Sequence, residues 1–330
     1  MSAPLLAIRD LVKVYGAPGA PGGGVRALDG VSLRLDSGEM VALVGESGSG
    51  KSTLLAVAAA LEPATAGRVE LEGRDLATCS RSELRALRRR VQVVFQDPYE
   101  SLDPRQTIGD IVAEPLVVHG LGGAPDERTA RVRELLAEVG LEPPEFFLAR
   151  RPAELSGGQR QRVAIASALA TGPALLLADE PVSMLDVSVR AEILNLLARL
   201  RRTHRIAVLL VTHDLATAAA VAERVAVMYL GRIVEEGPTR AVLAAPAHPY
   251  TRALVAANPA ADPSRRRARD ETLPRAERAD VAALPSGCRF HPRCPRAEER
   301  CRADEPALRP LAPGPGRAAA CHFAEEVARG

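Results

Sequence analysis

Three short segments carry residues whose types and spacing could bind and cleave a phosphate chain. GESGSGKST (45–53) fits the pattern GxxxxGK followed by Ser or Thr, in which backbone N–H groups curl around phosphate oxygens. ALLLADE (174–180) is an apolar run that ends in two acids, and LSGGQ (155–159) lies between these two segments. The spacing predicts a phosphate-binding site with carboxylates beside it.

The first segment has the surroundings that a phosphate-binding loop needs. Met40–Val44 is a strand-length apolar run, and Lys51–Leu61 is rich in Ala and Leu, so strand, glycine loop and helix follow in order. Chance matches to the pattern occur, but this context argues against one. We expect Lys51 to contact the β and γ phosphates and the Ser52 hydroxyl to bind Mg²⁺.

The two acids follow a run of apolar residues. Asp179 is expected at the carboxyl end of a buried strand, where ligands bind in doubly wound sheets, and would steady Mg²⁺. Glu180 would polarise the attacking water, because phosphoryl transfer depends on positioning and on charge stabilisation. An Asp-Glu pair alone is more typical of a solvated strand end, and the LSGGQ segment favours the catalytic interpretation.

The elements around these segments predict an α/β fold. Val91–Phe95, Ala174–Ala178 and Ile206–Thr212 are apolar runs separated by helical stretches, which indicates a mostly parallel sheet buried on both faces. Ile8–Tyr15 reads as an edge strand. Between Asp97 and Gln161 the pattern is helical, with Thr129–Val139 amphipathic, which predicts an inserted helical subdomain.

The boundaries come from breakers and from composition. Residues 16–24 are a Gly/Pro run that predicts a loop, and Arg224–Glu236 predicts a hairpin turning at Gly231-Arg232. Residues 258–285 have the composition of an exposed linker. We therefore expect a main domain at 1–237, with the helical subdomain at about 97–161, and a C-terminal extension at 238–330.

Composition excludes several classes of protein. The chain has 330 residues, 47% of them hydrophobic, which suffices for one large core and a smaller appendage. A net charge of +2 from 43 basic and 41 acidic residues produces no field that would attract nucleic acid. The N-terminus lacks the pattern of a secretory signal, and no stretch approaches the roughly 20 apolar residues of a membrane helix. We expect a cytoplasmic protein whose membrane role comes through a partner.

Together the three segments resemble one family, the ATP-binding cassette (ABC) ATPases. The resemblance implies a P-loop NTPase (RecA-like) core that hydrolyses ATP with Mg²⁺, and LSGGQ closing over ATP held by another subunit. Gln96 matches the glutamine that contacts Mg²⁺ and the water and reports to the membrane partner, and His213 matches the histidine that holds the γ-phosphate. Without that context, a lone His after a strand is more often structural.

The same resemblance assigns the remaining positions. Tyr15 matches the aromatic that stacks on adenine, and Asp186 the acid that couples the two sites of a dimer. Catalysis is expected from Glu180, His213 and Gln96, and the Mg²⁺ ligands are expected to be Ser52, Gln96 and Asp179. The ATP contacts are expected from Tyr15, Gly45, Ser47, Gly48, Ser49, Gly50, Lys51, Ser52, Thr53 and Asp179, with Ser156, Gly157, Gly158 and Gln159 reaching the ATP of the partner subunit.

Four longer stretches resemble the ATPase subunits of bacterial dipeptide and oligopeptide importers. These are FQDPYESLDPRQTIGDIVAEPL, ADEPVSMLDVSVRAEILNLL, HPYTRAL (248–254) and the terminal cysteines, and the SLDPR wording is closer to the F-type than to the D-type subunit. Met184 replaces the small residue usual in ADEPVSALD. The implied partners are two permease subunits, a second cassette ATPase (a heterodimer, or alternatively a homodimer) and an extracytoplasmic binding protein, at the cytoplasmic face of the membrane.

Two other functions stay open. An importer of nickel or another small solute shares almost every motif quoted. A soluble ABC ATPase of DNA repair or translation would show tandem cassettes or long inserted arms, and this chain shows neither.

Cys288, Cys294, Cys301 and Cys321 lie in a region too polar to build a core unaided, and a cytoplasmic chain is unsuited to disulfides. Their gaps of five, six and nineteen residues are wider than the CxxC pairs of structural zinc sites. In the resembled family such a quartet suggests a 4Fe-4S cluster. The alternatives are zinc, with His291 or His322 recruited, and free cysteines; Cys79 stands apart.

Overall fold

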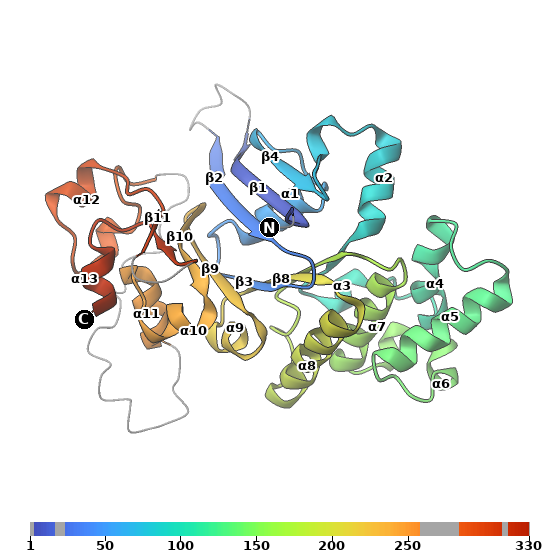
Figure 1. The fold of residues 1–330 in the computed structure, drawn as a ribbon. Coiled ribbons are helices and arrows are strands. Elements are labelled where there is room, and N and C mark those ends of the chain that lie inside the picture. The colour runs from blue at the N-terminus through green and yellow to red at the C-terminus, as the bar shows by residue number, and fades with distance from the viewer. Residues whose placement is uncertain (1–2, 17–23, 258–283, 312–315, 330) are drawn as a thin grey trace. The chain divides into compact units, whose positions relative to one another are not determined.

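The structure, a computed structural model, describes residues 3–16, 24–257, 284–311 and 316–329 (Figure 1). The chain divides into two compact units, and each is described by itself. The first unit comprises Met1–Leu6, Leu35–Glu39 and Leu71–Val211. The second comprises Ala7–Arg34, Met40–Glu70 and Thr212–Gly330. The predicted linker falls almost wholly outside the described residues, as does most of the predicted Gly/Pro loop.

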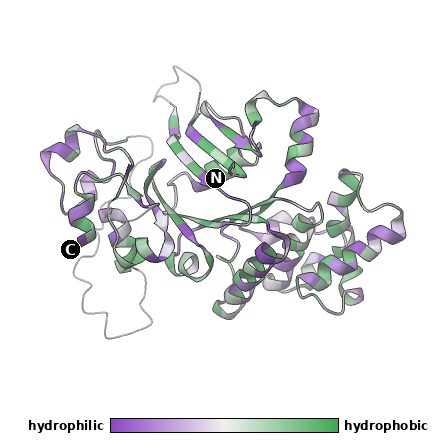
Figure 2. Ribbon diagram, in the orientation of Figure 1, coloured by the Kyte–Doolittle hydropathy of each residue, from purple (hydrophilic) through white to green (hydrophobic). Residues whose placement is uncertain are grey.

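The first unit is built on three parallel strands. β6 (Val91–Val94), β7 (Leu175–Asp179) and β8 (Ala207–Thr212) pair in that order, with Val91 opposite Leu175 and Leu175 opposite Ala207. β8 is buried throughout and β7 is buried up to its last residue, as expected of parallel strands covered on both faces. In Figure 2 the strand labelled β8 in Figure 1 is drawn mostly in the green of hydrophobic residues, as the sequence predicted.

Helices make up the rest of the first unit, beside the short β5 (Arg74–Asp75). They are η1 (Leu76–Thr78), α2 (Arg81–Arg90), α3 (Pro98–Ser101), α4 (Ile108–Val118), α5 (Pro125–Glu138), α6 (Glu145–Leu148), η2 (Pro152–Glu154), α7 (Gly157–Leu169) and α8 (Val187–His204). α4 and α5 pack on α7 around Ile108, Leu135 and Val163, which are fully buried. Helix α5 contains nearly all of the amphipathic stretch Thr129–Val139 and begins at Pro125, a residue type favoured in a first turn.

The second unit holds a five-stranded arrangement in the order β11-β12-β10-β9-β3. Its strands are β3 (Met40–Val44), β9 (Arg224–Tyr229), β10 (Arg232–Pro238), β11 (Arg309–Pro310) and β12 (Ala318–Ala319). β3 and β9 are parallel, and the other pairs are antiparallel. The C-terminal segment thus adds two short strands beside β10, with Ala319 opposite Glu235.

The β9-β10 hairpin is confirmed, but its turn lies one residue earlier than predicted. Arg232 already pairs with Tyr229, so the turn is Leu230-Gly231, with φ angles of 43° and 83°. Two central residues with positive φ are typical of the tight turn that matches strand twist. The sequence signal was weak because Leu rarely adopts this conformation.

A further sheet of the second unit has the order β2-β1-β4, formed by β2 (Val25–Leu35), β1 (Leu6–Tyr15) and β4 (Ala66–Leu71). The prediction of β1 as an edge strand is wrong, because β2 and β4 pair with its two sides. The alternating burial of β2, which follows the Gly/Pro run, was not recognised in the sequence. The remaining elements are α1 (Lys51–Ala58), α9 (Leu215–Val221), α10 (Thr239–Ala244), α11 (Pro249–Ala257), η4 (His291–Arg293), α12 (Glu299–Ala303) and α13 (Ala324–Arg329).

The α/β class is therefore confirmed. Among the described helices, none has the length and apolar character needed to cross a bilayer. The division into 1–237 and 238–330 stays a prediction.

Candidate functional site

The phosphate loop of the second unit is shaped by close backbone contacts. Gly50, the N-cap of α1, has φ 105°, and Gly48 has φ 80°. A Cβ at Gly45 would lie 2.2 Å from the Met228 carbonyl oxygen, and one at Gly50 would lie 2.5 Å from the Ala27 carbonyl oxygen. Only glycine fits at these positions, so neighbouring strands force the loop to curl as a phosphate cradle must.

Lys51 lies inside this curl. Its side chain is buried, and Nζ donates to the carbonyl oxygens of Gly45 at 2.7 Å and Glu46 at 2.8 Å. Ser47, Gly48 and Ser52 are exposed, whereas Ser49 is buried and Thr53 is half-buried. An ammonium group beside the N-terminus of a helix forms a site for an anion. The loop therefore fits a phosphate chain.

The first unit brings two predicted catalytic residues together. Asp179 ends β7, and Glu180 follows with φ 44°, a left-handed conformation that is costly for a residue with a Cβ. The Glu180 N–H donates to the Val211 carbonyl at 3.0 Å, which holds this backbone. Gln96 Nε2 donates to the Glu180 carboxylate at 3.4 Å. Such held strain is typical of functional sites.

The LSGGQ segment forms the N-terminus of α7. Ser156 Oγ accepts from the Gln159 N–H at 3.3 Å, and the Ser156 N–H donates to Gln159 Oε1 at 3.0 Å, a capping box. Ser156 is exposed, and the first turn carries two glycines. A Cβ at Gly158 would lie 2.5 Å from Val189 Cγ1 on α8. The segment is thus a helix N-terminus with little side-chain cover.

The remaining predicted residues lie at the ends of strands and helices. Exposed His213 follows β8, and the side chain of the next residue, Asp214, caps α9. Tyr15 ends β1 and is 38% exposed, with Lys13 Nζ 4.8 Å from its ring centroid. Asp186 is exposed at the N-cap of α8. The roles assigned to these residues stay predictions.

The predicted site residues divide between the two units. The phosphate loop, Tyr15 and His213 belong to the second unit, whereas Gln96, Asp179, Glu180, LSGGQ and Asp186 belong to the first. The first unit also contains a groove of about 320 Å³ whose wall includes Phe95, Leu102, Ile111 and Glu114. Phe95, the residue before Gln96, is 50% exposed.

The four C-terminal cysteines line one small cavity of about 20 Å³. Burial raises the pKa of the Cys288 and Cys294 thiols and raises that of Cys321 to about 11. His291 and His322 also line the cavity, but one ring nitrogen of each lies 3.0 Å from a backbone carbonyl oxygen. The structure thus places the predicted quartet together.

Nevertheless, no three His, Cys, Asp or Glu side chains in the described parts of the chain are arranged to hold a metal ion. The predicted 4Fe-4S cluster is therefore not supported by the geometry. Cys79 lies apart, and its Sγ is 3.3 Å from the Asp75 carbonyl oxygen.

The sequence interpretation missed two residues that touch the phosphate loop. Tyr250 Oη accepts from the Glu46 N–H at 2.9 Å, and the Arg293 guanidinium donates to both Glu46 carboxylate oxygens at 2.9 and 3.1 Å. Tyr250 lies in HPYTRAL, which contributed only to the resemblance. No local pattern marked Arg293, because its partner lies 247 residues away.

The comparisons with known proteins agree with this geometry. Residues 28–183 match the family model described as ABC transporter, and residues 234–301 match the one described as oligopeptide/dipeptide transporter, C-terminal region. The chain is 44% identical to the di/tripeptide transport ATP-binding protein DppF of Pseudomonas aeruginosa, over 98% of each protein. It is 52% identical to the "Probable peptide ABC transporter ATP-binding protein" y4tS of Sinorhizobium fredii, over 90% of this chain and 82% of that protein.

Solved structures agree as well. The dimeric post-hydrolysis structure of the ATP-binding cassette MJ0796, bound to ADP and Pi, is 35% identical with a TM-score of 0.64, over 71% of this chain and 99% of that one. The cbiO1 protein of Clostridium perfringens, part of the cbiONQ ABC transporter complex, is 30% identical with a TM-score of 0.65, over 74% of this chain and 92% of that one. The chain therefore belongs to the ATP-binding proteins of ABC transporters, in the group with an oligopeptide/dipeptide C-terminal region, and is an ATPase of that family.

Proposed function

We propose that this ATPase powers the import of dipeptides or oligopeptides. The observation that carries the proposal is the match over 98% of the chain to a di/tripeptide transport protein, together with the C-terminal region at 234–301. The F-type assignment is part of the proposal. Import of nickel or another small solute is the alternative, and a soluble ABC ATPase is a more distant one.

Binding and turnover draw on different residues in this proposal. The loop residues 45–53 hold the phosphates, with Lys51 on the β and γ phosphates and the Tyr15 ring on adenine. Ser52, Asp179 and Gln96 hold Mg²⁺, which neutralises the charge that builds up on the phosphates. Glu180 orients and polarises the water, and His213 holds the γ-phosphate. The contact of Gln96 with Glu180 supports placing both beside the water.

A second cassette completes each site in this proposal. Ser156, Asp186 and Val187 are exposed, Val187 by 80%, so the signature segment and the residues before α8 are available to another subunit. The helix N-terminus at Ser156–Gln159 would approach phosphate held by the partner's loop, and Asp186 would couple the two sites. We propose a heterodimer with the other cassette type.

The groove of the first unit is the proposed docking site for a helix of a permease subunit. Half-exposed Phe95 and buried Leu102 and Ile111 offer an apolar floor, and Glu114 adds a charge at the rim. Its position next to Gln96 would connect permease movement with the attacking water. The chain would then sit peripherally at the cytoplasmic face of the membrane, and a binding protein would deliver the peptide from the other side.

A variant separates docking from nucleotide binding. Glu114→Arg should abolish co-purification with the permease subunits and leave nucleotide binding unchanged. Glu134→Arg, at an exposed glutamate of α5, is the matched control and should keep the complex intact. Equal retention of permease by both variants would place the docking site elsewhere.

The cysteine quartet is proposed as a metal site despite its present geometry. Four thiols on one cavity are a donor set that suits iron–sulfur ligation, with zinc as the alternative. Elemental analysis of anaerobically purified protein for iron, sulfide and zinc tests this proposal, with a variant that carries serine at all four positions as the control. Absence of all three from the intact protein would leave the cysteines as free thiols.

Purification from gently solubilised native membranes, followed by mass spectrometry, tests the function itself. Two permease subunits, a second cassette and a peptide-binding protein are the expected companions. A nickel-binding protein instead would support the alternative substrate, and ribosomal or DNA-repair proteins would overturn the transporter assignment.

A further inference from the structure

Two residues of the predicted C-terminal extension (238–330), Tyr250 and Arg293, contact Glu46 of the phosphate loop. Glu46 follows the first glycine of the loop. The Arg293 guanidinium donates two hydrogen bonds to the Glu46 carboxylate. The hydroxyl oxygen of Tyr250 accepts a hydrogen bond from the backbone N–H of Glu46. Lys51 in turn donates to the carbonyl oxygen of the same residue at 2.8 Å. The N–H, carbonyl and side chain of Glu46 are therefore all engaged.

The protein covers one side of these contacts, because Arg293 and Tyr250 are buried or nearly so while the Glu46 side chain is 41% exposed. The Arg293 side chain is 11% exposed, and Tyr250 is fully buried. A bidentate arginine–carboxylate pair adds fixed geometry as well as energy. Its hydrogen bonds to Glu46 raise the pKa of Arg293 above the usual value, so the charge is permanent.

Other contacts hold Tyr250 and Arg293 in place. The Tyr250 ring packs at a tilt against those of Tyr229 and Phe290, with centroid distances of 4.6 and 5.5 Å. The Tyr250 N–H donates to His248 Nδ1 at 3.0 Å. Arg293 ends η4, where its own N–H donates to the Phe290 carbonyl. Both residues therefore also have contacts outside the phosphate loop that hold them in place.

The effect on the loop follows from its covalent geometry. Gly45 and Glu46 provide the carbonyl oxygens that receive Lys51, so fixing residue 46 fixes the place of the ammonium group. A loop that is already curled before nucleotide arrives loses less conformational entropy on binding. Without the contacts to Glu46, the loop would lose more conformational entropy on binding, and nucleotide affinity would be lower.

We propose that Arg293 and Tyr250 are positioning residues for nucleotide binding, which preorganise the phosphate loop through Glu46. The C-terminal extension then sets the nucleotide affinity of the cassette. The proposal rests on the proposed ATP site and adds two residues that would act on it through Glu46.

The test compares Arg293→Gln with the full-length wild-type protein in a titration with a fluorescent ADP analogue in the presence of Mg²⁺. Affinity should fall roughly 5- to 20-fold, as expected when a charged hydrogen bond is lost. Tyr250→Phe removes only the acceptor of the Glu46 N–H and should show a smaller loss. Arg293→Lys keeps the positive charge but cannot donate two parallel hydrogen bonds, so it should recover part of the affinity.

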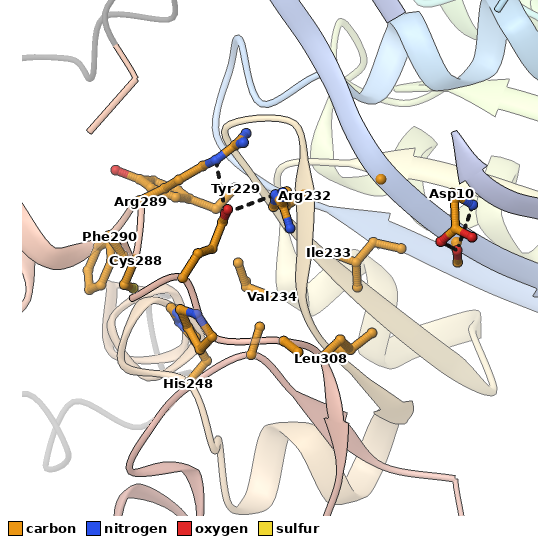
Figure 3. Close-up of a pocket in the computed structure, with 16 residues that line it drawn as sticks. Asp10, Tyr229, Arg232, Ile233, Val234, His248, Cys288, Arg289, Phe290 and Leu308 are labelled. Atoms are coloured by element: carbon orange, nitrogen blue, oxygen red, sulfur yellow. Dashed lines mark hydrogen bonds and ion pairs between the residues drawn. The ribbon is translucent and has the colours of Figure 1, made fainter. Parts of the chain in front are cut away.

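Arg289→Gln is the matched control. Arg289 lies four residues earlier and lines a cavity of about 340 Å³, as does Arg232 (Figure 3). Both arginines pair with the Glu305 carboxylate, and neither contacts Glu46. Arg289 also pairs with Asp29, so this variant weakens the attachment of the C-terminal segment without touching Glu46. Its melting temperature should fall while nucleotide affinity stays within about twofold of wild type.

A double-mutant cycle with Glu46→Gln gives the decisive readout. Once Glu46→Gln has removed the carboxylate, Arg293→Gln should cause little further loss of affinity. Full additivity of the two losses, equal losses in the Arg289 and Arg293 variants, or unchanged affinity in a folded Arg293→Gln protein would each overturn the proposal. Failure of the wild-type protein to bind nucleotide would instead overturn the ATP site.

Discussion

The two units differ in how their predicted site residues are held. In the second unit the phosphate loop is closed by its own chain: Lys51 is buried, two carbonyl oxygens receive its ammonium group, and backbone oxygens exclude any Cβ at Gly45 and Gly50. In the first unit Gln96, Ser156 and Asp186 are exposed. The difference leads us to expect that one chain can organise nucleotide binding, whereas turnover also needs groups from a second cassette.

The physical reason is that the phosphate loop should be ordered before nucleotide binds, whereas the α7 N-terminus should stay exposed until a second subunit arrives. A loop that cradles phosphate gains affinity from being rigid before binding. The N-terminus of α7 would have to stay uncovered to meet another subunit, and its capping box keeps it ordered without one. Variants of the two units should therefore fail differently.

The largest expected effect is on turnover alone. Glu180→Gln should lower the rate of ATP hydrolysis about 10²- to 10⁴-fold, because the water loses its base. Nucleotide affinity should stay unchanged, since the loop in the second unit is intact. Steady-state phosphate release and a binding titration measure the two quantities. Glu192→Gln, at an exposed glutamate of α8, is the control and should hydrolyse at the wild-type rate. Near-normal hydrolysis by Glu180→Gln would remove Glu180 from its assigned role.

The next effect is on binding. Lys51→Ala should weaken nucleotide affinity about 10- to 100-fold, because a charged hydrogen bond to phosphate contributes roughly 1.5–3 kcal/mol. Isothermal titration with ADP measures the loss. Lys51→Arg should also lose affinity, because the larger planar guanidinium does not fit where the phosphate loop encloses the compact ammonium group. Full affinity in Lys51→Arg would show that charge alone suffices there.

A smaller effect separates the signature helix from ordinary helix capping. Ser156→Ala and Ser80→Ala each remove the N-cap of a capping box, at α7 and at α2. Both should lower the free energy of unfolding by about 1 kcal/mol. Only Ser156→Ala should also lower hydrolysis by the paired cassettes, without changing nucleotide affinity. Chemical denaturation and ATPase assays on both proteins decide this, and equal hydrolysis would reduce Ser156 to a structural cap.

The smallest effect is expected at Met184. Its side chain is 61% exposed, so Met184→Ala should change the free energy of unfolding by less than about 0.5 kcal/mol. Thermal denaturation measures the change. A larger loss would mean that Met184 packs on something outside this chain's described residues.

Local patterns predicted more of the site than of its surroundings. The phosphate loop, β7 and the N-terminus of α7 follow from short motifs in which glycines, an apolar run and a capping pair act on their neighbours. The edge position of β1 was wrong because strand order depends on pairing with β2 and β4, which distant segments supply. The hairpin turn was one residue off, because register depends on both strands.

The amino-acid sequence by itself determined the chemistry of this protein: which residues can curl around phosphate, which acids end a buried strand, and which helix presents glycines at its N-terminus. These features are local, because backbone sterics and strand burial act within a few residues. Only the tertiary structure decided that Tyr250 and Arg293 hold Glu46. Such contacts join residues some 200 positions apart, and they form only when burial of apolar surface brings the distant segments together.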